Sequence, residues 1–124
     1  MNKEALLNVA KALRESPKPG RFDMGYYVDD TCGTPACALG HYASREDLQN
    51  FMRLVKDDDG DWTVQYVERV AENNYVDFEH DEVCEHFGIS LRQATQLFGP
   101  VGCGGAKAAN DAAEYIEHFV AQNS

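Results

Sequence analysis

Glycine and proline interrupt this chain at short intervals, so it can form only short helices and strands. Between the interruptions, apolar residues recur every three or four positions, as they do along one face of an amphipathic helix. Together with capping signals, this spacing predicts helices over residues 2–15, 34–42, 81–87, 90–98 and 106–121. A further helix is predicted to begin at a capping box over 44–47 and to bury Leu48, Phe51, Met52 and Val55.

One segment has a different period. Apolar and polar residues alternate from Trp62 to Tyr66, which indicates a half-buried strand. The aspartate-rich stretch 57–61 before it is typical of a turn, so one option is a small β-hairpin near 53–66. The other option is a helix that continues through Val70. The predicted fold is therefore mainly α: a single compact domain, residues 1–124, of about five short helices, with room for that hairpin.

Length and composition allow one domain with a modest core, because the chain has 124 residues of which 44% are hydrophobic. No apolar run approaches the roughly 20 residues of a membrane span. No apolar signal region follows the Met-Asn-Lys-Glu start. We therefore expect a cytoplasmic protein that does not engage membranes, and we expect its cysteines to remain thiols in that reducing compartment.

The chain is strongly acidic, with 21 acidic against 11 basic residues and a formal net charge of −10. A surface of this sign repels nucleic acid and anionic lipid at long range. It favours solubility and contact with a basic protein. We therefore expect a protein partner that carries positive charge, and no direct binding of nucleic acid.

The segment from Cys32 to His41 combines rare residue types with helix-start signals. Thr34 and Pro35 are typical of the N-cap and the first helical position, which would place Cys37 in the first turn. His41 would then share a face of the helix with Cys37, four residues earlier. In the simplest interpretation the cysteines pack as small apolar residues around a tight turn, and His41 is a partly exposed ring.

Three other interpretations of this segment stay open. Cys32, Cys37 and His41 could bind zinc. The fourth zinc ligand would come from a distant part of the chain: Cys84, Cys103, His80 or His86. Cys37 could instead be a redox-active or nucleophilic thiol, although Cys-x-x-Cys spacing is lacking. A disulfide between the two cysteines of the segment is the third.

Two stretches of the chain carry a resemblance. One is Phe22-Asp-Met-Gly25 followed by Cys32-Gly-Thr-Pro-Ala-Cys-Ala-Leu-Gly-His41. The other runs from Phe87-Gly-Ile-Ser90 through Ala94 to Leu97-Phe98-Gly-Pro100. Together they resemble small phage and bacterial proteins of no assigned activity. The resemblance implies no reaction, so it assigns no catalytic residue and no cofactor.

The acidic turn matches a calcium-binding loop in part. With Asp57 as the first position, Asp59, Asp61 and Glu68 fall at oxygen-ligand positions of an EF-hand loop. The sixth position, where such loops need glycine for a sharp turn, is Trp62. We therefore interpret the stretch as an exposed, aspartate-rich turn. No cofactor is expected; zinc at the cysteine segment and calcium at 57–68 are the alternatives.

Residues 81–98 have the rhythm of a helix-turn-helix, with Gly88 at the turn. The second helix would expose Arg92, Gln93 and Gln96, which are residue types that can contact bases. The first helix carries acids that would face the phosphates, and a basic footprint is lacking. We therefore interpret the segment as a helical hairpin used for packing, with a DNA-binding regulator as the alternative.

These observations lead to the hypothesis of a non-enzymatic accessory or regulatory protein that binds another protein. A sharper version is a phage-type inhibitor that offers carboxylates to the basic groove of a host nucleic-acid-handling complex. A small zinc domain is the alternative class. The acids predicted to form the interacting face are Asp57, Asp58, Asp59, Asp61, Glu79, Asp81, Glu82 and Glu85.

Overall fold

The fold is known from a computed structural model, which describes residues 1–15, 28–29, 34–35, 37–45, 47, 52–56, 58–60, 62–66, 69–70, 81–99, 102–106 and 108–123. Helices in these ranges are α1 (Lys3–Arg14), α2 (Ala38–Ala43), α3 (Asp81–Phe87), α4 (Leu91–Phe98), α5 (Gly102–Gly105) and α6 (Ala109–Gln122). Strands are β1 (Val28–Asp29), β2 (Thr34–Pro35), β3 (Met52–Lys56), β4 (Trp62–Tyr66) and β5 (Arg69–Val70). The mainly α prediction, with one small hairpin, is confirmed.

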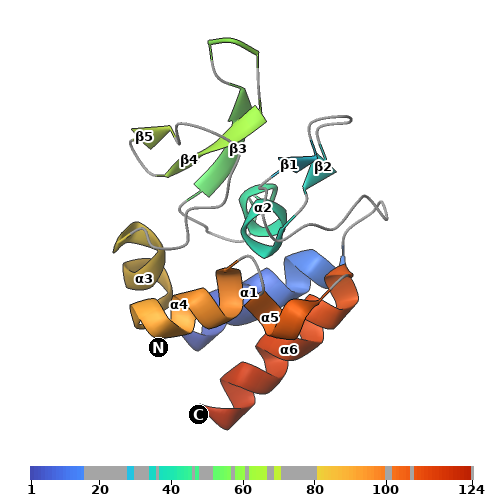
Figure 1. The fold of residues 1–124 in the computed structure, drawn as a ribbon, viewed down its shortest axis with the longest axis vertical. Coiled ribbons are helices and arrows are strands. Elements are labelled where there is room, and N and C mark those ends of the chain that lie inside the picture. The colour runs from blue at the N-terminus through green and yellow to red at the C-terminus, as the bar shows by residue number, and fades with distance from the viewer. Residues whose placement is uncertain are drawn as a thin grey trace.

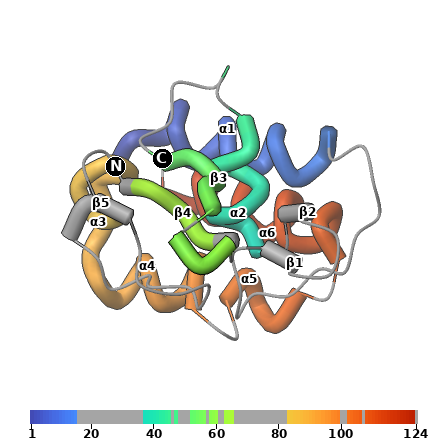
Figure 2. Tube along the Cα trace, turned by 90° about the horizontal axis from the view of Figure 1, so that it is seen from above, coloured from blue at the N-terminus to red at the C-terminus, as the bar shows by residue number. Residues whose placement is uncertain are grey.

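The helices and the strands lie in separate parts of the molecule (Figure 1). Helices α1, α3, α4, α5 and α6 form one layer, and both chain ends lie at this helical end. Helix α2 lies between that layer and the small antiparallel sheets, and it contacts both α1 and β3. Figure 2, seen from above, places the β3–β4 hairpin over the helices. None of the helices described is long and apolar enough to cross a membrane.

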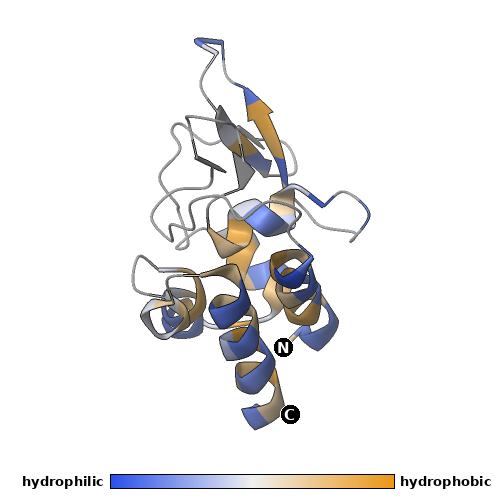
Figure 3. Ribbon diagram, turned by 90° about the vertical axis from the view of Figure 1, so that its right-hand side faces the viewer, coloured by the Kyte–Doolittle hydropathy of each residue, from blue (hydrophilic) through white to orange (hydrophobic). Residues whose placement is uncertain are grey.

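Helix α1 forms where the sequence predicts a helix over 2–15. The side chain of Asn2 caps it by accepting a hydrogen bond from the Ala5 amide at 3.1 Å. One face is buried, including Leu6, Val9 and Leu13, and it packs against α2 and α6. Both hydrophilic and hydrophobic residues occur along the helices in Figure 3, as amphipathic helices require.

Helices α3 and α4 form the predicted hairpin around Gly88, whose φ of +61° is in the left-handed region. The chain start docks on this turn, because the Asn2 amide donates to the Phe87 carbonyl at 2.8 Å. A Cβ at Gly88 would lie 3.1 Å from the backbone of Met1 and of Asn2. Ser90 begins α4 with a complete capping box, as its position in the sequence predicts.

The predicted hairpin near 53–66 is confirmed, and the two options for that region are decided in favour of strands. Strands β3 and β4 pair from Met52↔Tyr66 to Lys56↔Trp62, and β5 adds to the far side of β4. The helix predicted over 44–55 is therefore wrong in its second half, and Ser44 does not begin a helix, because it is the C-cap of α2. Met52 and Val55 lie in β3, where cross-strand pairing outweighs helical spacing; Leu48 and Phe51 lie outside the described residues.

Two boundaries also differ from the prediction. Thr34 and Pro35 do not begin a helix; they form β2, which pairs with β1. A proline is tolerated there because a two-stranded sheet consists only of edges. Helix α2 begins at Ala38 instead, capped by Cys37. The predicted connector over 101–105 contains the short turn α5, in which Cys103 and Gly104 are left-handed, with φ of 54° and 67°.

Replacing Gly88 by alanine should destabilise the fold more than replacing Gly60. Both glycines have positive φ, which costs an alanine about 1–2 kcal/mol. A Cβ at Gly60 would meet nothing within 4 Å, whereas one at Gly88 would push on the docked chain start. Urea unfolding of the two variants measures the difference; equal losses in the free energy of unfolding would show that the chain start does not pack on this turn.

Candidate functional site

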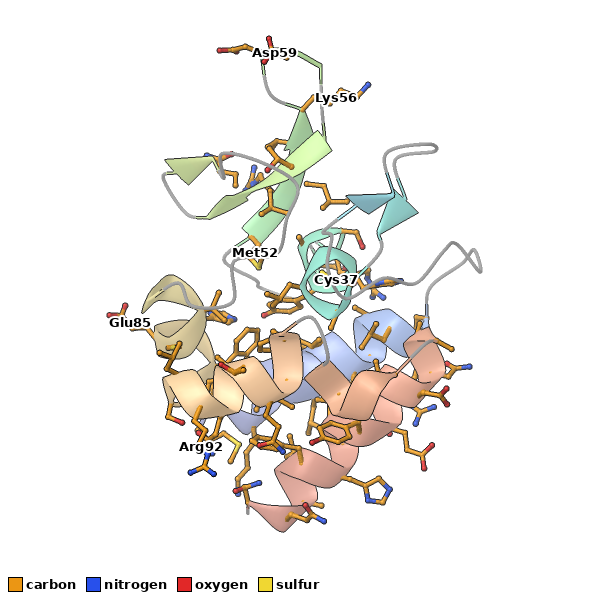
Figure 4. All side chains as sticks on the ribbon, in the orientation of Figure 1. Cys37, Met52, Lys56, Asp59, Glu85 and Arg92 are labelled. Carbon is orange, nitrogen blue, oxygen red and sulfur yellow. The ribbon has the colours of Figure 1, made fainter. Side chains whose placement is uncertain are left out.

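The cysteine-rich segment ends in a buried helix start. Cys37 is the N-cap of α2, and its Sγ accepts a hydrogen bond from the Gly40 amide at 3.2 Å. Its side chain is only 1% exposed, and His41 is 5% exposed. The expectation of a partly exposed His41 ring is therefore wrong. The packing interpretation accounts for both residues, because Cys37 Sγ and His41 Nδ1 both bond to backbone atoms of the same helix start. Figure 4 shows Cys37 on α2.

His41 is held as a neutral ring. Burial lowers its pKa, while the bond to the Cys37 carbonyl opposes that shift. Nδ1 lies 2.8 Å from the Cys37 carbonyl oxygen, which can only accept, so Nδ1 carries the proton. The hydrogen bond from the buried His41 ring to the Cys37 carbonyl therefore stabilises the first turn of α2.

The structure does not bring the other predicted zinc ligands that it describes into a cluster with Cys37 and His41. Cys103 is buried, its thiol donates to the Leu97 carbonyl at 3.2 Å, and burial raises its pKa to about 12. Cys84 is half-buried on α3. Cys32 and His80 lie outside the described residues. Within the described part of the chain, no three His, Cys, Asp or Glu residues gather in a way that could hold a metal ion.

A hydrogen bond that the sequence does not reveal joins α2 to α3. The hydroxyl of Tyr42 lies 2.8 Å from Nε2 of His86. Burial raises the pKa of Tyr42 to about 12 and lowers the pKa of His86, so the hydroxyl donates to a neutral imidazole. Spacing could not predict this pair, because 44 residues separate its members and only the packing of α2 on α3 brings them together.

The predicted acidic residues that the structure describes lie in two regions. Asp58 and Asp59 are exposed in the turn of the hairpin, and Glu85 is exposed on α3. Figure 4 shows Asp59 at the outer tip of the hairpin and Glu85 beside the helical layer. Asp81 and Glu82 belong to the first turn of α3. The remaining predicted acids lie outside the described residues: Asp57, Asp61 and Glu79.

The structure weakens both partial matches to known motifs, the calcium-binding loop and the DNA-binding helix-turn-helix. An EF-hand loop follows a helix, but the acidic turn follows β3, and Trp62 to Tyr66 are paired in β4. In the helical hairpin, the Gln93 side chain accepts from the Ser90 amide, and Gln96 donates to the Tyr115 hydroxyl at 2.8 Å. Two of the three side chains that could contact bases are thus engaged within the protein, which supports the packing interpretation.

A third acidic region was not predicted from the sequence. An open hollow of about 510 Å³ lies between α5 and α6, and Asp111 and Glu114 border it. Both side chains are exposed. Glycines in a connector and single acids along an amphipathic helix are common, so only the tertiary contact of α5 with α6 reveals this hollow.

Comparisons with protein-family models, with curated proteins and with solved structures found no match to this chain. The phage-like resemblance of the two sequence segments therefore stays a prediction. The features that bear on function are the charge of the chain and the geometry of its described residues.

Stability should fall as the pH drops below about 6.5, the usual pKa of histidine. The pKa values of His41 and His86 are lowered in the folded protein, so these histidines bind protons more tightly in the unfolded chain. The loss of stability should therefore begin near pH 6.5, about the ordinary pKa of histidine, and level off below the pKa values of the folded state. His86→Gln should reduce the change in unfolding midpoint between pH 7.5 and 5. The matched variant His118→Gln replaces an exposed histidine, and its change in unfolding midpoint between the two pH values should equal that of the natural chain.

The cysteines should differ in reactivity in the folded state. Iodoacetamide at pH 8 should modify half-buried Cys84 before Cys37 and Cys103, which are 1% and 3% exposed. Peptide mapping by mass spectrometry follows each thiol separately, and the same reaction in urea provides the control with all thiols accessible. Fastest modification at Cys37 would contradict the packing interpretation and favour an activated thiol.

Proposed function

We propose that this protein is a non-enzymatic accessory or regulatory factor that acts by binding a basic protein. The observation that carries the proposal is the excess of acid, a formal net charge of −10 on 124 residues. Such a surface raises the rate of encounter with a positively charged partner and disfavours negatively charged ones.

The arrangement of the basic residues strengthens this proposal. The Arg14 guanidinium bonds both oxygens of Glu117, at 2.6 and 2.9 Å. Arg45 bridges Glu15 and Asp47, each at 2.8 Å. These two arginines are therefore engaged with carboxylates of the same chain and are poorly placed to bind phosphate.

Exposed acids that are not paired with Arg14 or Arg45 lie on α1, at the hairpin tip, on α3 and on α6, at Glu4, Asp58, Asp59, Glu85, Asp111 and Glu114. A partner that matched several of these regions would have to present an extended basic surface. Proteins that handle nucleic acid have such surfaces, because they neutralise phosphates with lysine and arginine. This supports the sharper form of the proposal, in which the protein occupies the nucleic-acid groove of its partner.

Charge reversal at Asp58, Asp59 and Glu85 should weaken partner binding and reduce its dependence on salt. Each lost ion pair removes part of the electrostatic attraction to the partner. Because all three side chains are exposed, their substitution should alter the fold little. The measurement is quantitative capture of proteins from a bacterial lysate on immobilised natural or triple-variant protein at increasing sodium chloride. The natural protein should retain a basic protein that salt releases.

Lys3→Glu/Lys11→Glu is the matched control, since both lysines are exposed and the change makes the protein more acidic. This control should retain the partner at least as well. For the sharper form, the captured partner should lose its ability to hold duplex DNA while the acidic protein is bound. Capture that is indifferent to salt and to both variants would refute the proposal.

A further inference from the structure

The open hollow between α5 and α6 has one wall made of backbone and one made of side chains. Gly104 and Gly105, with φ of +67° and +76°, form the first wall. Asp111, Glu114 and Tyr115 of α6 contribute to the second. Positive φ favours glycine at both positions, and because glycine has no side chain, the backbone of these two residues is exposed at the hollow.

The ring of Tyr115 is held in place at this hollow. Gln96 of α4 donates to its hydroxyl at 2.8 Å. The Gly104 backbone packs against the ring, since an added Cβ there would lie 3.2 Å from Cε2 and 3.3 Å from Cδ2. These two contacts hold a half-buried aromatic ring that lines the hollow. The face of an aromatic ring carries partial negative charge, which attracts a cation.

The charge around the ring has the sign that a cation requires. Asp111 and Glu114 provide two carboxylates, and the residues described as lining the hollow include no lysine or arginine. Nε2 of His118 lies 3.7 Å from Oε1 of Glu114, and both side chains are largely exposed, so water reaches this pair. The hollow therefore combines an aromatic surface, two carboxylates and open space within one short stretch of α6.

We propose that this hollow receives an arginine side chain of the basic partner. A planar guanidinium can stack on an aromatic face and bond carboxylates through several N–H groups at once, whereas the compact lysine ammonium does this less well. This inference rests on the proposed function and names the point at which the partner is anchored. The proposed function does not depend on it, since the hairpin tip and α3 are separate acidic regions.

The direct test is a titration of the ¹⁵N-labelled 124-residue protein with N-acetyl-arginine amide, followed by amide NMR shifts. We expect saturable shifts at Gly104, Gly105 and Tyr115, with a dissociation constant in the millimolar range, about that of a single side chain. N-acetyl-citrulline amide, which has a similar shape without the charge, should produce no saturable shift. N-acetyl-lysine amide should bind several-fold more weakly than the arginine compound.

Variants make the test specific to the hollow. Asp111→Asn/Glu114→Gln should weaken arginine binding about tenfold, whereas Asp58→Asn/Asp59→Asn, with the same change in net charge, should leave it unchanged. Tyr115→Leu should also weaken it, and Tyr115→Phe, which keeps the ring but loses the bond to Gln96, should weaken it less. Asp111 and Glu114 are both exposed, so their variants stay informative even if Tyr115→Leu is unstable.

Two outcomes would overturn the arginine site. One is a set of amide shifts that grow linearly with ligand concentration beside many acidic residues, and the other is an equal effect of the two double variants. The two proposals then separate clearly. If the hollow binds no arginine but charge reversal at the hairpin and α3 still releases the partner, only this inference fails. If arginine binds in the hollow but no basic protein is captured in a salt-dependent way, the proposed function fails instead.

Discussion

The burial of one face of α1 is the interaction on which the rest of this structure depends. Its apolar side packs against α2 and α6, and its start docks on the turn between α3 and α4. Helices this short are barely stable alone in water, so they persist because they share this core. The Arg14–Glu117 ion pair closes the far end of the contact, but both side chains are about 40% exposed, and such pairs contribute little energy.

The central position of α2 explains why Cys37 and His41, which suggest a site in the sequence, are buried and bonded within the protein. A six-residue helix placed between the helical layer and the sheets has all of its residues buried. Its polar groups must therefore find partners inside the protein. Cys37 and His41 bond within the helix, and Tyr42 reaches His86 of α3. The ring of Tyr42 also contacts Phe87, with centroids 5.6 Å apart, which joins the polar pair to the aromatic core.

The charge of the chain is kept at the surface, away from this core. Among the described residues, the buried polar side chains are His41 and Thr63, and neither carries a charge when His41 is neutral. Acids can therefore accumulate on the surface without disturbing the fold, because exposed charges are solvated and screened. This separation lets the same small domain be stable and strongly acidic, which is the property that the proposed binding function uses.

The sequence alone determined the amphipathic helices and their stops, because these follow from local periodicity and capping. Gly88 and Ser90 act where their positions indicate, and the alternation from Trp62 to Tyr66 forms a strand. Only the tertiary structure decided that 52–56 is a strand and that Thr34 pairs in a sheet, since the energy of both comes from a neighbouring strand. The same holds for the Tyr42–His86 bond and the hollow around Tyr115. Tyr42 and His86 are 44 residues apart, and Gln96 and Tyr115 are 19 apart, so only packing brings each pair within hydrogen-bonding distance.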